Sequence, residues 1–229
     1  MLRSIARLMA AGAAVVGLTS CASISVDNAA ESARNDRPQI VYVMNFSTEQ
    51  ANFEVDRSGT ELADFKSNLQ LMLRTGLVKE ITDKLVPAVA ENSLDNRRSE
   101  NAWLIRGEFT TVKQGSRLLR SAIGFGAGGT KLETRVQVYD LAINPDAPFL
   151  TFSTSGGSNA EPGAILAFTT DPLQLAIGGV SGAAHGLSED TARTARQITA
   201  ELSDDMYARG WISADQRVAP KRQRDTDTW

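Results

Sequence analysis

The hydrophobic and polar positions of the chain repeat with two periods, one typical of strands and the other typical of helices. Between residues 131 and 139, charged and amide side chains alternate strictly with apolar residues and threonine. This period of two predicts a half-buried strand with one wet face. A turn at Asn144-Pro145-Asp146 and an apolar run over residues 149–155 predict an antiparallel hairpin. Runs of branched and aromatic residues predict three further strands, at residues 39–46, 86–90 and 102–112.

Two longer stretches carry apolar residues at helical spacing. The first begins at Thr60 and ends before Pro87, because a helix interior does not tolerate proline. The second has Ser188 as its expected N-cap, Asp190 in its first turn and Gly210 as its expected C′ residue. The element order β-α-(β)-β-β-β-α predicts an α+β fold: a mainly antiparallel sheet with two principal helices packed on one face.

The first twenty residues have the three parts of an export signal. Arg3 and Arg7 supply the positive charge, and residues 8–18 form an uncharged apolar run. That run is about half the roughly 20 residues that a membrane-spanning helix needs. A cleavable signal peptide is therefore favoured over an uncleaved anchor.

Leu18-Thr19-Ser20-Cys21 resembles a lipobox, in which a branched apolar residue and two small residues precede a cysteine. The resemblance implies that a diacylglycerol alkylates the Cys21 thiol, that cleavage follows ahead of Cys21, and that the new amino group is acylated. Two or three acyl chains hold a protein stably at a membrane, whereas one holds it only marginally. Ala22, not Asp, follows the cysteine, which by resemblance to enteric lipoproteins favours sorting to the outer membrane.

These features divide the chain into four parts. Residues 1–20 are the expected signal peptide, residues 21–37 a flexible tether that starts at the lipidated cysteine, residues 38–212 a single α+β domain, and residues 213–229 a disordered tail. Inside the domain, the polar residues 47–59 predict a loop.

Composition narrows the classes of function. The net charge of -3 argues against nucleic-acid binding, which needs a basic face to offset phosphate charge. The single cysteine excludes an internal disulfide, and the single histidine, His185, makes a zinc site of His and Cys ligands implausible. We expect no metal and no cofactor other than the covalent lipid on Cys21.

The first glycine-rich segment, residues 115–131, joins two predicted strands. It contains Gly124, Gly126 and Gly128 within an apolar run. A phosphate-cradling loop is one interpretation, because glycine lets backbone N–H groups converge on an anion. The glycine spacing matches neither nucleotide-binding fingerprint, so we favour a close-packed connection or an interface.

The second glycine-rich segment, residues 162–186, is apolar and places Gly178, Gly182 and Gly186 four residues apart. On a helix these glycines would line one face and permit close backbone contact. Three interpretations remain open: a helix packed within the domain, a contact between subunits, and a hairpin that touches the membrane. His185, at the end of this segment, is expected to be a helix-end or surface residue and not a catalytic base.

From Trp103 onward the sequence resembles an uncharacterised family of bacterial lipoproteins, the domain of unknown function four-four-one-zero. Three features carry the resemblance: the strand ending in Gly107-Glu108-Phe109, the run from Gly115-Ser116-Arg117 to residues 123–128, and the glycine-rich stretch before the last helix. The family implies no established activity.

A more distant likeness is to the curli-secretion channel lipoproteins. The shared element order includes the strand at Ile105-Arg106-Gly107, the insertion at residues 124–129 and a last helix that ends near Gly210-Trp211. In those proteins the two insertions become membrane-spanning hairpins of a ring. Neither segment shows the sustained alternation that a barrel strand requires.

The sequence therefore favours an outer-membrane lipoprotein that faces the periplasm and acts as a binding or assembly module. Its expected partners are the membrane, through the lipid, and either a second copy or another envelope protein. The alternative is a subunit of a self-assembling ring or secretion-channel-like complex. A hydrolase is not expected, because no nucleophile elbow and no cluster of metal ligands appears in the sequence.

Overall fold

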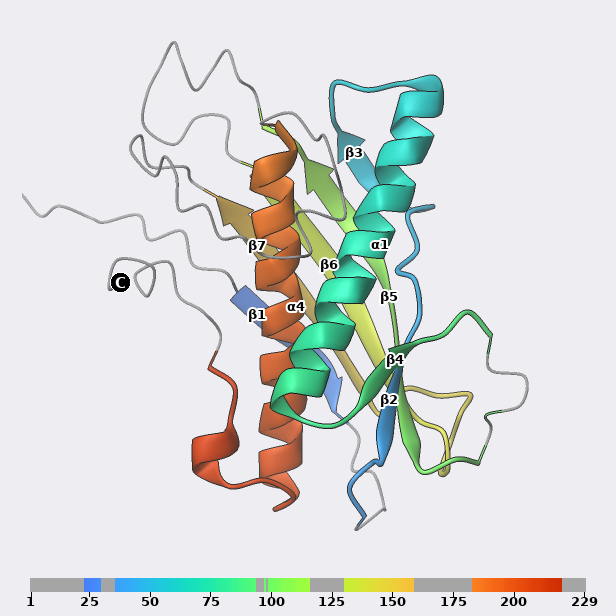
Figure 1. Ribbon diagram of the computed structural model, residues 1–229, viewed down its shortest axis with the longest axis vertical. Coiled ribbons are helices and arrows are strands. Elements are labelled where there is room, and N and C mark those ends of the chain that lie inside the picture. Colours follow the sequence, from blue (N-terminus) through green and yellow to red (C-terminus); the bar gives the residue numbers. More distant parts are fainter. Residues whose placement is uncertain are drawn as a thin grey trace, which may run out of the picture.

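A single mixed sheet with two long helices on one face makes up the fold (Figure 1). The computed structural model describes residues 23–29, 36–93, 97, 99–115, 130–158 and 183–219. The strands are β1 (Ser23–Ala29), β2 (Ile40–Val43), β3 (Asn52–Glu54), β4 (Ala88–Ala90), β5 (Ala102–Lys113), β6 (Thr130–Asp140) and β7 (Leu150–Ser158). The helices are α1 (Gly59–Lys84) and α4 (Ala183–Ala208), followed by a 3-10 turn, η1 (Ala214–Gln216).

The order of the strands across the sheet is β1-β7-β6-β5-β2-β4, and β3 pairs with the far end of β5. The pairs β1–β7, β7–β6 and β6–β5 are antiparallel, whereas β5–β2, β2–β4 and β3–β5 are parallel. The predicted α+β class, the β6–β7 hairpin and the two helices on one face are confirmed. The prediction of a mainly antiparallel sheet is wrong, because α1 carries the chain back between β2 and β4 and makes those strands run the same way.

The core lies between the helices and the sheet. The buried stripe of α1 consists of Leu69, Leu73, Leu77 and Ile81, and that of α4 includes Ala195, Ile198, Leu202 and Met206. They cover the buried sheet residues, among them Trp103, Phe109, Val136 and Phe152. The two helices also contact each other: Glu80 and Arg196 form an ion pair at 3.5 Å.

The folded region is larger than the sequence predicts at both ends. Residues 23–29, expected within a flexible tether, form the edge strand β1, and residues 213–219, expected in a disordered tail, pack on α4. The tail is held there because Val218 donates its backbone N–H to Ser203 Oγ at 3.0 Å and Arg217 pairs with Asp204 at 2.7 Å. Residues 220–229 and the expected signal peptide lie outside the described residues.

Two predicted helix and loop boundaries also change. Ser188 is not an N-cap, because α4 begins at Ala183 and Ser188 lies inside it. The predicted loop at residues 47–59 contains the short strand β3. The predicted C-terminus of α4 is correct: Gly210 has φ +74°, and the N–H groups of Gly210 and Trp211 bond to the carbonyls of Tyr207 and Met206. This pair of bonds is a Schellman motif.

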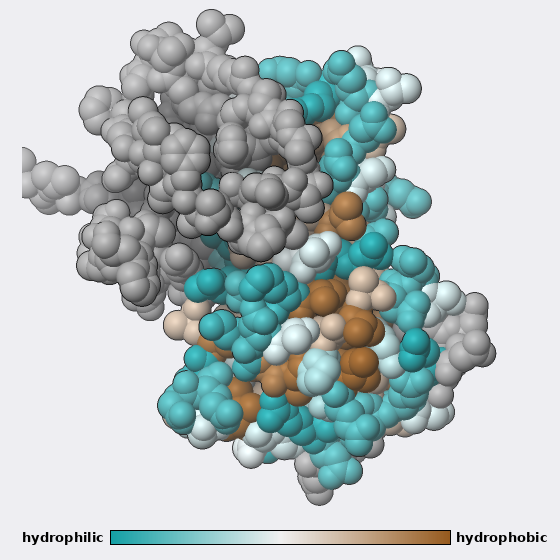
Figure 2. Space-filling model, viewed as in Figure 1, coloured by the Kyte–Doolittle hydropathy of each residue, from teal (hydrophilic) through white to brown (hydrophobic). Residues whose placement is uncertain are grey.

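The helix side of the molecule also carries exposed apolar surface (Figure 2). Apolar side chains gather over the C-terminal half of α1 and beside it toward β4, and polar side chains surround them. Partly buried hydrophobic residues that extend the core include Val78, Leu85 and Trp211.

Two half-buried glycines predict opposite effects of the same substitution. A Cβ at Gly107 in β5 would lie 2.3 Å from the Phe46 ring and 2.7 Å from the Arg135 carbonyl oxygen. A Cβ at Gly76 in α1 would lie 3.7 Å from the Ala195 Cβ, an ordinary contact. We expect Gly107→Ala to lower the free energy of unfolding by about 1–3 kcal/mol through overpacking. Gly76→Ala should raise it by about 0.5–1 kcal/mol through helix propensity.

Urea unfolding of the two variants and the wild type measures both effects. Each variant is the control for the other, since both add one methyl group to a half-buried glycine. A Gly107→Ala protein as stable as the wild type would show that Phe46 does not pack on β5 as described.

Candidate functional site

The structure places only one of the site residues predicted from the sequence. Gly186 lies in the first turns of α4. Cys21, Gly124, Gly126, Gly128, Gly178 and Gly182 lie outside the described residues. For the two glycine-rich segments, the structure shows only the strand and helix residues on either side. The pairing of the strands shows at which end of the sheet each segment begins.

Both glycine-rich segments leave the sheet at the same end. In β5 and β6, Lys113 faces Lys131, and in β6 and β7, Thr130 faces Ser158. The first segment follows β5 and precedes β6, and the second follows β7 and leads into α4. We call this end of the sheet, marked by Gly115, Thr130 and Ser158, the segment end.

A buried polar cluster lies between α4 and the sheet next to the segment end. Asp190 is fully buried in α4, and neither of its carboxylate oxygens has a hydrogen-bond partner among the described residues. The side chain of Thr130, at the start of β6, lowers the pKa of this carboxyl in part. Arg193, one turn further along α4, lies 3.6 Å from Asp190 Oδ1. Thr194 is also buried, and its hydroxyl lies 3.6 Å from the position a Cβ would take at Gly156 in β7.

Burial dominates the electrostatics of this cluster. Loss of water raises the pKa of Asp190, and Glu189 adds to the rise, while Thr130 and Arg193 oppose it. Taken together, these effects raise the pKa of Asp190 above its usual value. The cluster is therefore a place where protonation favours the folded state, because a buried neutral carboxyl costs less than a buried carboxylate.

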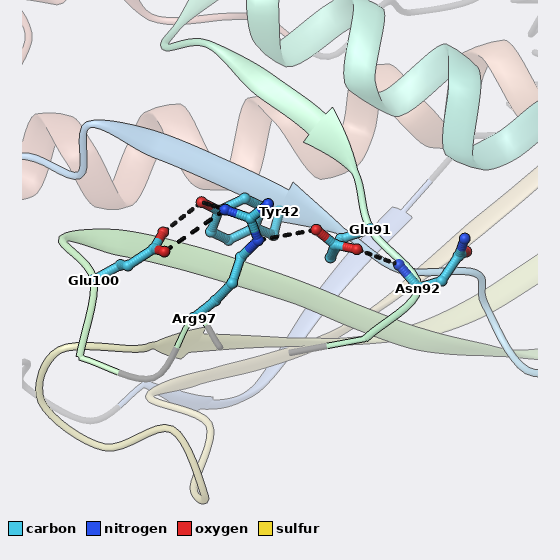
Figure 3. A network of polar contacts seen from close by, with 5 residues as sticks. All are labelled: Tyr42, Glu91, Asn92, Arg97 and Glu100. Atoms are coloured by element: carbon cyan, nitrogen blue, oxygen red, sulfur yellow. Dashed lines mark hydrogen bonds and ion pairs between the residues drawn. The ribbon is translucent and has the colours of Figure 1, made fainter. Parts of the chain in front are cut away.

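A second polar network covers the opposite face and the opposite end of the sheet (Figure 3). Tyr42 in β2 donates its hydroxyl proton to Glu100 at 2.5 Å and accepts a bond from Arg97 at 2.9 Å. The Arg97 guanidinium stacks over the Tyr42 ring at 4.7 Å and binds Glu91 at 3.0 Å. The network thus ties the connection between β4 and β5 down onto the sheet.

Beneath this network runs a small apolar cluster. Tyr42, Leu104 and Tyr139 lie side by side on β2, β5 and β6, since Leu104 faces Tyr42 on one side and Tyr139 on the other. Arg106 stacks over Tyr139 at 5.5 Å. Each tyrosine is therefore covered by an arginine, which keeps the apolar cluster dry while leaving charge at the surface.

Burial and the neighbouring Glu100 carboxylate raise the pKa of Tyr42 from its usual value of 10.0. The Asn92 backbone N–H, together with Arg97, lowers the pKa of Glu91. Tyr42 is thus a proton donor held in place by two charged groups. This arrangement suits a structural clamp, because the hydroxyl has both of its partners within the protein.

The described residues set limits on the chemistry. Within them, no group of three or more His, Cys, Asp or Glu side chains could hold a metal ion. Neither α1 nor α4 combines the length and the apolar character needed to cross a membrane. Sequence reasoning missed both polar clusters, because their members come from distant parts of the chain and follow no local motif.

We expect Tyr42→Phe to lower the free energy of unfolding by about 1 kcal/mol, because one phenolic hydroxyl with two charged partners is lost and water replaces it in part. The difference between the alkaline absorbance titrations of the wild type and the variant isolates Tyr42, and its midpoint should lie above pH 10.0. A midpoint at or below that value would mean that Tyr42 does not donate to Glu100.

We expect Asp190→Asn to stabilise the protein at pH 7 and to lose this advantage as the pH falls. The folded-state pKa of Asp190 is raised, so its contribution is favourable below its unfolded pKa and is lost as the pH rises through the folded pKa. Urea midpoints of both proteins at pH 7 and pH 4 measure the effect. An asparagine variant that is weaker at pH 7 would show that the Arg193 pair outweighs burial.

Comparisons with known proteins give a family and distant structural likenesses. The PelC dodecamer from Paraburkholderia phytofirmans has a TM-score of 0.39 and 9% identity, covering 76% of this chain and 94% of that chain. A PelC dodecamer carrying a single substitution, from the same organism, has a TM-score of 0.36 and 11% identity with the same coverage. A search of the curated proteins gives no match.

The family comparison covers most of the domain. A family model for a domain of unknown function matches residues 41–179. The matched range runs from β2 through β7 and includes the residues that carry the resemblance at Gly107 and at 123–128. Because the match spans more than half of the chain, the protein belongs to the family described as domain of unknown function (DUF4410).

Proposed function

We propose that the protein is a lipid-anchored envelope protein whose domain acts as a binding or assembly module, facing the periplasm at the outer membrane. The observation that carries the proposal is the position of the lipobox cysteine. Cys21 is followed by Ala22 alone before β1 begins at Ser23, so the expected lipid sits directly beside a folded domain.

The apolar surface on the helix side of the molecule supports a role in binding. The apolar side chains in Figure 2 gather over the C-terminal half of α1 and toward β4, away from the segment end. Apolar surface rimmed by polar residues is typical of sites that contact other proteins. The proposal assigns no catalytic step, no metal and no cofactor to the domain.

The alternative function is a subunit of a self-assembling ring or a secretion-channel-like complex. The sheet order leaves β1 and β4 as its two edges, and Val26 in β1 is half exposed. Edge strands present unpaired backbone groups that can pair with another copy. The short β4 is partly protected, because the Thr82 hydroxyl bonds to the Ala88 backbone N–H at 3.1 Å.

We expect the wild-type protein, extracted from membranes, to begin at Cys21 and to carry the mass of its acyl chains. Cys21→Ser should remove the acyl mass and leave residues 1–20 attached, because no thiol remains for lipidation and cleavage follows lipidation. Ser20→Ala is the matched control, since it keeps a small residue before the cysteine and should behave as the wild type. Intact mass spectrometry of membrane and soluble fractions makes the measurement. A wild-type polypeptide that begins at Met1 would contradict the anchor.

Crosslinking in whole envelopes, followed by detergent extraction, separates the two functions. A discrete crosslinked partner supports the binding module. Particles of defined large size made of this chain alone support the ring. A monodisperse monomer with no crosslinked partner contradicts both.

A further inference from the structure

The register of β1 fixes which end of the sheet lies next to the lipid. β1 pairs antiparallel with β7, so that Ser23 faces Ser155 and Ala29 faces Leu150. The chain therefore enters β1 at the end where β7 finishes, which is the segment end. The expected lipid and both glycine-rich segments thus belong to one end of the molecule.

Covalent geometry limits how far this end can lie from the lipid. Two peptide units join Cys21 to Ser23, and they span at most about 7 Å. A flexible tether of seventeen residues, counted from 21–37, would let the domain swing freely. The pairing of β1 with β7 removes that freedom, because the chain is fixed in the sheet two residues after Cys21.

Both lysines described at the segment end are paired with a glutamate. Lys113 pairs with Glu54 at 2.8 Å, and Lys131 pairs with Glu133 at 2.7 Å. These pairs are partly exposed and add little stability. Because these two lysines are neutralised by their partners, the orientation is inferred from the short link to the lipid.

We propose that the segment end of the sheet rests on the lipid bilayer and that the opposite end, with the turn between β6 and β7, points away from it. This inference rests on the proposed lipid anchor and adds the orientation of the domain. The two ends of β6 lie about 33 Å apart, given ten steps of about 3.3 Å between Thr130 and Asp140. The Tyr42 network and the apolar surface of the helices then face away from the bilayer.

Site-directed fluorescence quenching of the full lipoprotein tests the orientation. Lys113→Cys places a label at the segment end, and Ile143→Cys places one in the turn at the other end, where Ile143 is 45% exposed. Lipidation blocks the only native thiol, so each variant has a single reactive cysteine. The labelled proteins are reconstituted in vesicles of phosphatidylethanolamine and phosphatidylglycerol that contain nitroxide-labelled headgroups.

We expect quenching at position 113 to exceed quenching at position 143 several-fold. Lys131→Cys, beside Lys113 in the register, should repeat the result if the first variant folds poorly. Equal quenching at both ends, or stronger quenching at position 143, would overturn the orientation. Flotation of the same vesicles separates this failure from failure of the anchor: protein that does not float with lipid refutes the anchor, and protein that floats but shows equal quenching refutes only the orientation.

Discussion

The backbone pairing of β5 sets the positions of all other strands. On one side β5 pairs with β6 along almost its whole length, and on the other side it pairs with β2 at its start and β3 at its end. The Phe46 ring packs against β5 at Gly107, where a side chain would collide with it. A slip of one residue in β5 would turn its buried side chains to the solvent face. The shared location of both glycine-rich segments therefore depends on this one register.

The pattern of neighbouring residues predicts those elements that are formed by interactions between residues close together in the sequence. The hairpin of β6 and β7 follows from alternation and a turn, and α1 follows from its apolar stripe and from Pro87. The parallel strand pairs cannot be predicted from local pattern, because β2 and β3 lie far from β5 in the sequence and their pairing leaves no local signal. β1 was hidden for the same reason: its partner β7 lies more than one hundred residues away, and its own residues are mostly small and polar.

The two polar clusters show where the sequence misleads about single residues. Asp190 looks like a first-turn acid that favours a helix dipole, but α4 begins at Ala183, so Asp190 lies two turns inside and faces the sheet. Residues 183–187 carry no capping signal that would reveal the earlier start, and Gly186 among them is unfavourable in a helix. Tyr42 meets Arg97 and Glu100 only because β2 and β5 pair, across more than fifty residues of chain. The expected lipidation site, in contrast, depends on a short contiguous motif, so it can be predicted from the sequence without knowledge of the fold.

The two ends of the sheet differ in what holds them together. At the segment end, α4 covers a buried carboxyl whose pKa is raised by burial, so part of the packing there opposes the ionised state. At the other end, Arg97 satisfies Tyr42 and Glu91 at once, and the Schellman motif at Gly210 closes α4 while Arg209 stacks between Phe149 and Trp211. Next to the segment end, then, the buried Asp190 carboxylate oxygens have no hydrogen-bond partner among the described residues, whereas at the other end Tyr42, Arg97 and Glu91 satisfy one another.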